Sequence, residues 1–363
     1  MKNDLIQLVS TVALSALCAY LVLPRLIVFL KSNARLDIPN HRSSHKVPTP
    51  TMGGMCFFIG LVFAIIFSAS LEVVVVSGLI SLAAVLGLWD DSKGVSPKYK
   101  FLGQAIIATG FYLFGFSISP LTELTLGVSL PSFVDWMATM FFMLGLINAF
   151  NLIDGVDGLL IGLTLISSVV LAIIFFIQGQ SPYLFLSLGM IGVSCSFLIY
   201  NFEPAKIFMG DTGSLFIGTY ISSSVLKVAE GGNTDYSIIA ISLVLFVCVD
   251  MLRLFFGRYL ILRKPFLADR NHVHHVLLKI GWSDKKIVLH AYGFQLILTS
   301  MAFYLSFYDS FSLNLFVLIL TCVGMYGLLQ LLVYKKFRVL LRKTMEMKNR
   351  KIEGNHLLKS RFK

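Results

Sequence analysis

Charged residues are scarce in this chain of 363 residues, since Asp, Glu, Lys and Arg together make up only 13%. A soluble domain averages about 25% charged residues, so the composition excludes an ordinary soluble fold. Apolar residues supply 56% of the sequence instead. This balance is typical of a polytopic integral membrane protein.

Cysteine is also rare, and no two cysteines form a Cys-x-x-Cys pair. All five lie inside apolar stretches, where we expect core thiols rather than disulfides or zinc ligands. They are Cys18, Cys56, Cys195, Cys248 and Cys322.

Long apolar stretches are abundant, and a membrane-spanning helix needs about 20 such residues. We therefore predict an all-α polytopic membrane protein with about 11 transmembrane helices, in a single domain over residues 1–334. A large inner loop at 257–289 interrupts this domain, and a basic tail follows at 335–363. The first stretch is long for a cleaved signal peptide, so we expect it to be retained. The predicted spans are 5–30, 53–70, 72–88, 101–118, 133–150, 159–178, 182–200, 214–228, 237–256, 290–308 and 312–334.

Positive charge is distributed unevenly over these spans. Of the 30 Lys and Arg residues, all but Lys2 and Lys227 fall on one side of the membrane or in the tail. The positive-inside rule then predicts that the N-terminus lies outside and the C-terminus in the cytoplasm. The same rule explains the net charge of +11, so we expect contact with anionic membrane lipids and no nucleic acid.

Two adjacent aspartates, Asp90 and Asp91, follow an apolar run that ends at Trp89. Neighbouring carboxylates repel each other unless a cation or a shared proton relieves them. The pair therefore predicts Mg²⁺ binding or general-base work, with a solvated loop as the alternative. Lys98 and Lys100 follow closely and are placed to meet phosphates or lipid head groups.

The densest polar segment covers residues 148–158. Its polar residues recur at every third position, which keeps them near one face of a helix. Gly155 and Gly158 are expected to break that helix and to let the backbone approach a ligand. An EF-hand is excluded because no Glu stands at the twelfth loop position, whereas a polar helix cap stays open. The polar residues are Asn148, Asn151, Asp154 and Asp157.

A third motif, at residues 208–214, contains Asp211 between glycines. This carboxylate is suited to a hard cation, and its small neighbours would let phosphates come close. Thr212 or Ser214 is also a candidate cap for the helix that follows.

Three histidines lie beside an arginine in the large inner loop. Imidazoles and a guanidinium together suit a diphosphate or a nucleotide. Zinc is the alternative, but no cysteine accompanies them and carboxylate-rich surroundings favour Mg²⁺. The residues are Arg270, His272, His274 and His275.

Two further features carry charge near the inner face. The basic loop around Arg42 is suited to a lipid phosphate, or it merely obeys the orientation rule. Asp250 and Arg253 have the spacing of an i,i+3 salt bridge, and charges inside a membrane helix are costly and often functional.

Together these motifs indicate metal-assisted phosphoryl chemistry at the inner face. Mg²⁺ is typically held by one or two carboxylates plus substrate phosphates, and Mn²⁺ is the alternative ion. An enzyme embedded in this way is suited to joining a soluble phosphorylated donor to a lipid acceptor.

Five stretches in one order resemble the polyprenyl-phosphate N-acetylhexosamine-1-phosphate transferase family. They are DIPNHRSSH, LGLWDD, NAFNLIDGVDGL, FMGDTGSL and DRNHVHH, over residues 37–275. The resemblance implies a bundle of about ten or eleven transmembrane helices with a cytoplasmic active site. It also implies Mg²⁺-dependent transfer of a HexNAc-1-phosphate from a UDP-N-acetyl sugar to undecaprenyl phosphate, with release of UMP. Such a reaction would start a cell-wall polymer or a lipopolysaccharide O-antigen, which implies a multi-pass protein of the bacterial cytoplasmic (inner) membrane.

The resemblance also implies roles for single residues. Asp90 and Asp91 match an aspartate pair of the family that is implicated in catalysis, and Asp211 matches a metal-binding aspartate. Asp154 and Asp157 match a motif tied to nucleotide binding or catalysis. The form HVHH is closer to the GlcNAc-1-phosphate members than to the peptidoglycan enzyme, which favours UDP-GlcNAc as the donor. A further aspartate of some members is missing, because position 94 is Gly.

Three alternatives stay open at this point. The same reaction with another UDP-N-acetyl sugar is the nearest one. A transporter or lipid flippase would explain the many helices, but not the gathering of polar motifs on one face, and no internal repeat is evident. A non-catalytic nucleotide-sugar sensor is the third. The sequence also leaves open a homodimer, and a choice between direct attack by the lipid phosphate and a phospho-enzyme.

Overall fold

The computed structural model of the chain describes residues 2–39, 47–260, 277–278, 281–308 and 310–331. Helices run side by side through the described part, and the only sheet there is a pair of two-residue strands. The prediction of an all-α fold is therefore confirmed. The strands are β1 (Leu36–Asp37) and β2 (Thr49–Pro50), and the helices are α1 (Lys2–Ser32), η1 (Gly53–Phe57), α2 (Phe58–Ser68), α3 (Leu71–Lys93), α4 (Pro97–Leu113), α5 (Ser119–Leu126), α6 (Ser132–Ile153), α7 (Leu159–Ile177), α8 (Ser181–Asn201), α9 (Gly210–Glu230), α10 (Thr234–Leu260), α12 (Asp284–Leu305) and Phe311–Leu331.

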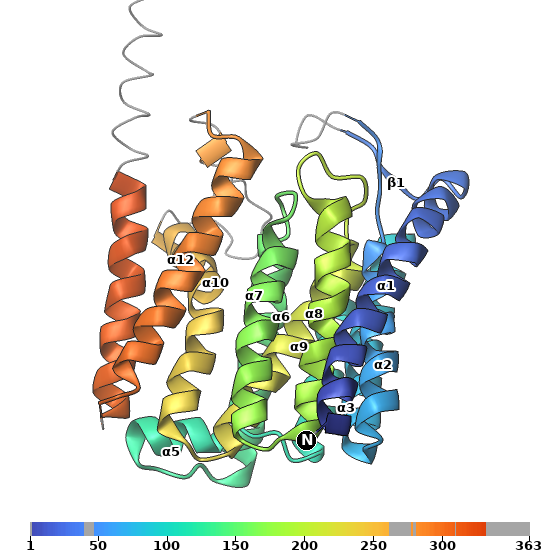
Figure 1. Cartoon of the computed structure of the whole chain (residues 1–363). Coiled ribbons are helices and arrows are strands. Elements are labelled where there is room, and N and C mark those ends of the chain that lie inside the picture. Colours follow the sequence, from blue (N-terminus) through green and yellow to red (C-terminus); the bar gives the residue numbers. More distant parts are fainter. Residues whose placement is uncertain (1, 40–46, 261–276, 279–280, 309, 332–363) are drawn as a thin grey trace, which may run out of the picture.

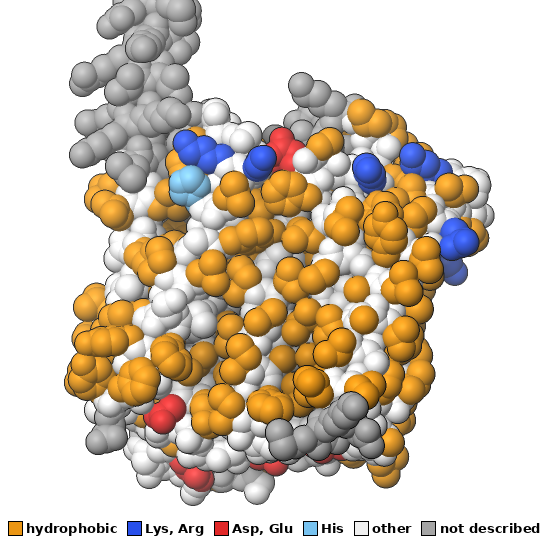
Figure 2. All heavy atoms as spheres, in the orientation of Figure 1, with side chains coloured by type: hydrophobic (Ala, Val, Ile, Leu, Met, Phe, Trp, Pro, Cys, Tyr) orange, Lys and Arg blue, Asp and Glu red, His pale blue; other side chains and the backbone are white. Residues whose placement is uncertain are grey.

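Each of the eleven predicted spans coincides with a helix, although the helices differ in length and polarity. Within the described ranges, eight helices are long and apolar enough to cross a membrane. The other three predicted spans correspond to η1 with α2, to α4 and to α9. Figure 2 shows hydrophobic side chains over the middle of the visible face, with Lys and Arg at its upper edge. The polytopic membrane class is confirmed, whereas the number of crossings stays a prediction.

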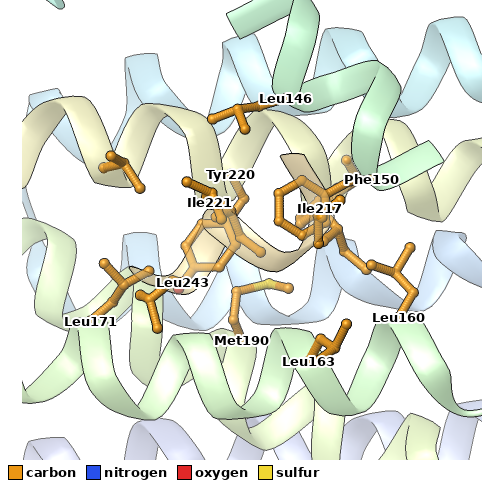
Figure 3. Packing of buried hydrophobic residues seen from close by; sticks show 14 of the residues in the cluster. Leu146, Phe150, Leu160, Leu163, Leu171, Met190, Ile217, Tyr220, Ile221 and Leu243 are labelled. Carbon is orange, nitrogen blue, oxygen red and sulfur yellow. The ribbon is translucent and has the colours of Figure 1, made fainter. Parts of the chain in front are cut away.

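Helix α9 lies at the centre of the bundle, with every side chain from Thr212 to Ala229 buried. It packs against α3, α6, α7 and α10, and Figure 3 shows its residues Ile217, Tyr220 and Ile221 among apolar side chains of the neighbouring helices. Hydroxyl groups of α9 donate to its own carbonyls one turn earlier, as Thr219 does to Leu215 at 2.8 Å. These hydrogen bonds within the helix allow a Ser-rich helix to stay buried. The serines and threonines themselves are the reason why its apolar signal in the sequence is weak.

Helices α3 and α9 form the pair that positions the site. They pack closely, and the end of α3 that carries Asp90 and Asp91 lies beside the start of α9. At the other end of the pair, the Lys227 ammonium of α9 lies 2.9 Å from the Glu72 carboxylate of α3. The two helices are therefore antiparallel, with contacts between charged groups at both ends.

Two helix boundaries differ from the prediction. Helix α3 continues to Lys93, so Asp90 and Asp91 lie in its last turn rather than in a loop. The predicted outer loop 119–132 contains the short helix α5. The Asp135 carboxylate fixes the start of α5, because it accepts hydrogen bonds from the Ser119 amide at 3.1 Å and from the Ser117 hydroxyl at 2.7 Å.

The five cysteines are free thiols, as predicted, but only Cys56 and Cys322 are fully buried. Cys195 is exposed on the side of α8. The predicted basic tail at 335–363 and most of the loop 261–276 lie outside the described residues.

Candidate active site

The site is built around the Lys100 side chain at the start of α4. Its ammonium lies 2.9 Å from Asp90 Oδ2 of α3 and also pairs with Asp211 Oδ2 of α9. Asp90 is held in turn by the backbone amide of Val95, which donates to Oδ1 at 2.6 Å. Three helices therefore bring two carboxylates and one ammonium to a single point.

Asp91 has a different task from its neighbour. Its carboxylate accepts hydrogen bonds from the backbone amides of Asp211 and Thr212, both at 2.9 Å, and from the Thr212 hydroxyl at 2.6 Å. Both oxygens are thus engaged by the first turn of α9, whose amides would otherwise lack partners. Gly210, with φ of 69°, leaves the space that this contact needs, since a Cβ there would lie 2.5 Å from Asp91. Asp91 is the cap of α9, and the expectation that Thr212 or Ser214 caps this helix was wrong.

The two asparagines of the polar segment bind neighbouring helices. Asn151 Nδ2 donates to Asp211 Oδ1 and to Ser214 Oγ, both at 2.7 Å. Asn148 Nδ2 donates to Gln104 Oε1 of α4 at 2.8 Å. Asn151 therefore orients the Asp211 carboxylate, and Asn148 fixes the helix that carries Lys100.

Asp154 lies just beyond the end of α6, where the predicted break occurs. The surrounding protein partly buries this carboxyl, and the negative charges of Asp211, Asp91 and Asp157 oppose a further one. Together these effects raise the pKa of Asp154 from 3.8 to about 8. A shift of this size at a cluster of carboxylates is typical of a functional site.

Asp157 serves the loop between α8 and α9. Its Oδ2 accepts a hydrogen bond from the Ala205 amide at 2.9 Å. The segment that leads to Asp211 is thereby attached to the segment that carries Asp154. The spacing within residues 148–158 predicted that their polar side chains share one face of a helix. In the structure these side chains bind three different neighbours, which are α4, the start of α9 and the loop between α8 and α9.

Three residues of the site were missed by the sequence analysis. Gln104 is buried and meets Asn148, while Asn201 and Tyr292 both bind the backbone of Gly158. Gln104 and Tyr292 lie in helices with many polar residues, and Asn201 is the last residue of α8. Their role depends on contacts between distant segments, so no local motif marks them.

The remaining predicted site residues are not brought into this cluster. Lys98 is exposed on the first turn of α4. Five others lie outside the described residues: Arg42, Arg270, His272, His274 and His275.

The residues present fit a hard divalent cation. Asp90 and Asp211 both contact the Lys100 ammonium, so their oxygens lie within reach of one small cation. Among the described residues no group of three or more His, Cys, Asp or Glu side chains forms a complete metal cage. A site with two carboxylates suits Mg²⁺, which commonly takes waters and substrate phosphates as its remaining ligands.

A cavity of about 500 Å³ lies beside the loop 154–158, between α10, α12 and the helix Phe311–Leu331. Its lining is mostly apolar and includes Ile153 and Leu159, the residues on either side of the loop 154–158. Asp250 also lines it, accepts a hydrogen bond from the Tyr326 hydroxyl and lies 3.6 Å from Arg253, which confirms the predicted ion pair.

Comparison with known proteins points to one family. The model of glycosyl transferase family 4 matches residues 73–229, the segment from α3 to α9 that holds the carboxylate cluster. A probable undecaprenyl-phosphate N-acetylglucosaminyl 1-phosphate transferase of Bacillus subtilis (strain 168) is 34% identical over 342 residues, covering 88% of this chain and 93% of the relative.

Two other relatives are similar over two thirds or more of this chain. A decaprenyl-phosphate N-acetylglucosaminephosphotransferase of Mycobacterium tuberculosis is 31% identical over 292 residues, with 70% of this chain and 71% of the relative covered. A phospho-N-acetylmuramoyl-pentapeptide-transferase of Staphylococcus aureus is also 31% identical, over 67% of this chain and 80% of the relative. All three names describe the transfer of a phosphosugar.

Proposed function

This chain belongs to glycosyl transferase family 4, and we propose that it transfers N-acetylglucosamine 1-phosphate from UDP-GlcNAc to a polyprenyl phosphate, with release of UMP. Undecaprenyl phosphate is the acceptor named for the Bacillus subtilis relative, which is similar over 93% of its length. The observation that carries the proposal is the convergence of Asp90, Asp211 and Lys100 at one point, inside the segment that the family model matches.

The proposed reaction exchanges one phosphorus–oxygen bond for another. An oxygen of the lipid phosphate attacks the β-phosphorus of the donor. The bond from that phosphorus to the bridging oxygen breaks, and the oxygen leaves with UMP. A phosphate monoester is already a competent nucleophile, so we prefer this direct attack to a phospho-enzyme.

The chain's own residues supply charge and position for this step. The Lys100 ammonium lies between the two carboxylates. There it would stabilise the negative charge of the substrate phosphates. We propose Asp90 as a cation ligand rather than as a base, because its carboxylate is already held by the Lys100 ammonium and the Val95 amide. Asp91 is left out of this role because α9 uses both of its oxygens.

Magnesium is part of the proposal, with Asp90 and Asp211 as its protein ligands. When bound, the ion would neutralise the diphosphate and make UMP a better leaving group. Asn151, which donates to Asp211 Oδ1 at 2.7 Å, leaves the other oxygen of that carboxylate directed to the site.

The place of the protein in the cell follows from its helices and relatives. We propose the bacterial inner membrane, with the carboxylate cluster on the cytoplasmic side. Lys227 lies at the opposite end of α9 from the cluster, whereas Lys100, Lys206 and Lys285 lie at or near the cluster end. This asymmetry agrees with the positive-inside rule. The apolar cavity next to the loop 154–158 supports a lipid acceptor that approaches from within the membrane.

The test is UMP release by purified protein in detergent. Undecaprenyl phosphate, Mg²⁺ and UDP-GlcNAc are supplied together, and each is then omitted in turn. UMP that forms only with all three present supports the proposal. A panel of other UDP-N-acetyl sugars identifies a different donor if UDP-GlcNAc is inactive, and no UMP from any of them would reject the enzyme in favour of a transporter.

A further inference from the structure

The loop that carries Asp154 is held by a tyrosine from a distant helix. The Tyr292 hydroxyl of α12 donates a hydrogen bond to the Gly158 carbonyl at 2.5 Å. Gly158 has φ of 82° and directly precedes α7, so it is the residue at which the loop becomes a helix. A left-handed conformation of this kind favours glycine, whose backbone then depends on its neighbours to stay in place.

The other side of the same residue is held by an asparagine. The Gly158 amide donates to Asn201 Oδ1 at 3.1 Å, and Asn201 Nδ2 donates to the Ile207 carbonyl at 2.9 Å. Asn201 is only 5% exposed. Both polar backbone groups of Gly158 therefore have a side-chain partner from another segment, which fixes the end of the loop from two directions.

Gly162, one turn into α7, makes the tyrosine contact possible. A Cβ at this position would lie 1.8 Å from the Tyr292 hydroxyl oxygen, so no larger residue fits while Tyr292 keeps its place. Glycine inside a helix costs about 0.5–1 kcal/mol relative to alanine. The close approach of Tyr292 explains why a glycine stands at this helical position in spite of that cost.

We propose that Tyr292 is a positioning residue, which fixes the loop 154–158 through Gly158 and so holds Asp154 beside Asp211. Tyr292 has no contact with Asp90, Asp211 or Lys100 among the interactions of the described residues. Its effect on turnover must therefore pass through the loop. The kinetic part of this inference rests on the proposed function, but the structural part does not.

The experiment uses two variants that break the contact from opposite sides. Tyr292→Phe removes only the hydroxyl, and Gly162→Ala keeps the hydroxyl but displaces it. The matched controls are Tyr304→Phe, whose exposed hydroxyl on the same helix lies 2.8 Å from that of Tyr308, and Gly145→Ala, where a Cβ meets nothing within 4 Å among the described residues. All four are purified as the full chain in detergent.

Two readouts are compared with the native protein. Hydrogen exchange of the peptide 154–163 should become severalfold faster in both contact-breaking variants, because a local opening loses a stabilising hydrogen bond. We expect kcat to fall about tenfold, since small displacements of a reacting group are costly. KM for UDP-GlcNAc should stay within about threefold of the native value, since Tyr292 binds no substrate. The controls should change neither readout.

Unchanged exchange in the peptide 154–163 would overturn the contact as a positioning device. A native kcat in both variants would overturn the role of Tyr292 in turnover. Faster exchange over the whole bundle would also overturn that role, because it indicates general destabilisation. If the native protein releases no UMP at all, the proposed function fails instead, and the exchange measurement still decides whether Tyr292 holds the loop.

Discussion

The two ends of the α3–α9 pair use the same kinds of residue for different purposes. At the end away from the site, Lys227 lies 2.9 Å from Glu72 and 3.0 Å from Glu230, and its ammonium lies 5.2 Å from the centre of the Tyr183 ring. The Tyr183 hydroxyl also donates to Glu72 at 3.1 Å. One ammonium thus pairs with two partly exposed carboxylates, so little uncompensated negative charge is buried at this end.

At the site end, a single ammonium faces a larger number of carboxylates. Lys100 contacts Asp90 and Asp211. Asp91 binds the backbone amide of Asp211, and Asp154 lies close enough for the charge of Asp211 to act on it. Such an excess is costly unless a cation or a proton offsets it. The comparison teaches that the presence of lysine–carboxylate pairs does not reveal a site, whereas an uncompensated excess of carboxylates does.

The largest expected effect comes from removing charge at the site end. Asp211→Asn should lower kcat at least about 1,000-fold even at saturating Mg²⁺, because the proposed cation loses one of two protein ligands. Its thermal midpoint should stay close to the native value, since asparagine can still occupy the same space. UMP release across a Mg²⁺ titration checks this, and near-native activity would remove Asp211 as the essential ligand.

A second prediction separates the two neighbouring aspartates. Asp91→Ala removes the cap of α9 and should lower both stability and activity, since loss of a helix cap costs about 0.5–2 kcal/mol. Asp90→Ala should abolish UMP release but leave the thermal midpoint nearly unchanged, because Asp90 binds Lys100, the Asp211 carboxyl and the loop amide of Val95 rather than the backbone of a helix's first turn. Thermal unfolding and UMP release are measured on both variants, and an identical pair of results would contradict the division of roles.

The sequence alone predicted the helical bundle and the main carboxylates, because both leave local signals. Apolar length marks a membrane helix, and Asp90, Asp154 and Asp211 stand in short polar motifs. The sequence did not predict that Asp91 caps α9 or that Tyr292 binds Gly158. These contacts join residues 120 and 134 positions apart, so they depend on how the helices pack rather than on any local pattern.

A third prediction breaks the end of the pair away from the site. Lys227→Met leaves Glu72 and Glu230 without their shared partner, and should lower the thermal midpoint by about 2–4 °C for each kcal/mol lost. Because both glutamates are partly exposed, we expect only a modest loss. Activity per folded molecule should stay near native, measured as UMP release after removal of aggregated protein. A large loss of kcat in the folded fraction would show that the two ends are coupled.

The last prediction concerns stability alone, as a function of pH, and it again distinguishes the two ends. The pKa of Asp154 is raised from 3.8 to about 8 in the folded protein, so between these values the folded chain holds a proton that the unfolded chain releases. Stability therefore falls as pH rises through this window and levels off above about pH 8. Asp154→Asn cannot titrate, so the decline of its thermal midpoint from pH 6 to 8.5 should be shallower. Lys227→Met leaves the surroundings of Asp154 intact and should keep the native slope. Equal slopes in native protein and Asp154→Asn would mean that the carboxylate excess at the site end does not hold a proton on Asp154, and the contrast between the two ends would then rest on the cation alone.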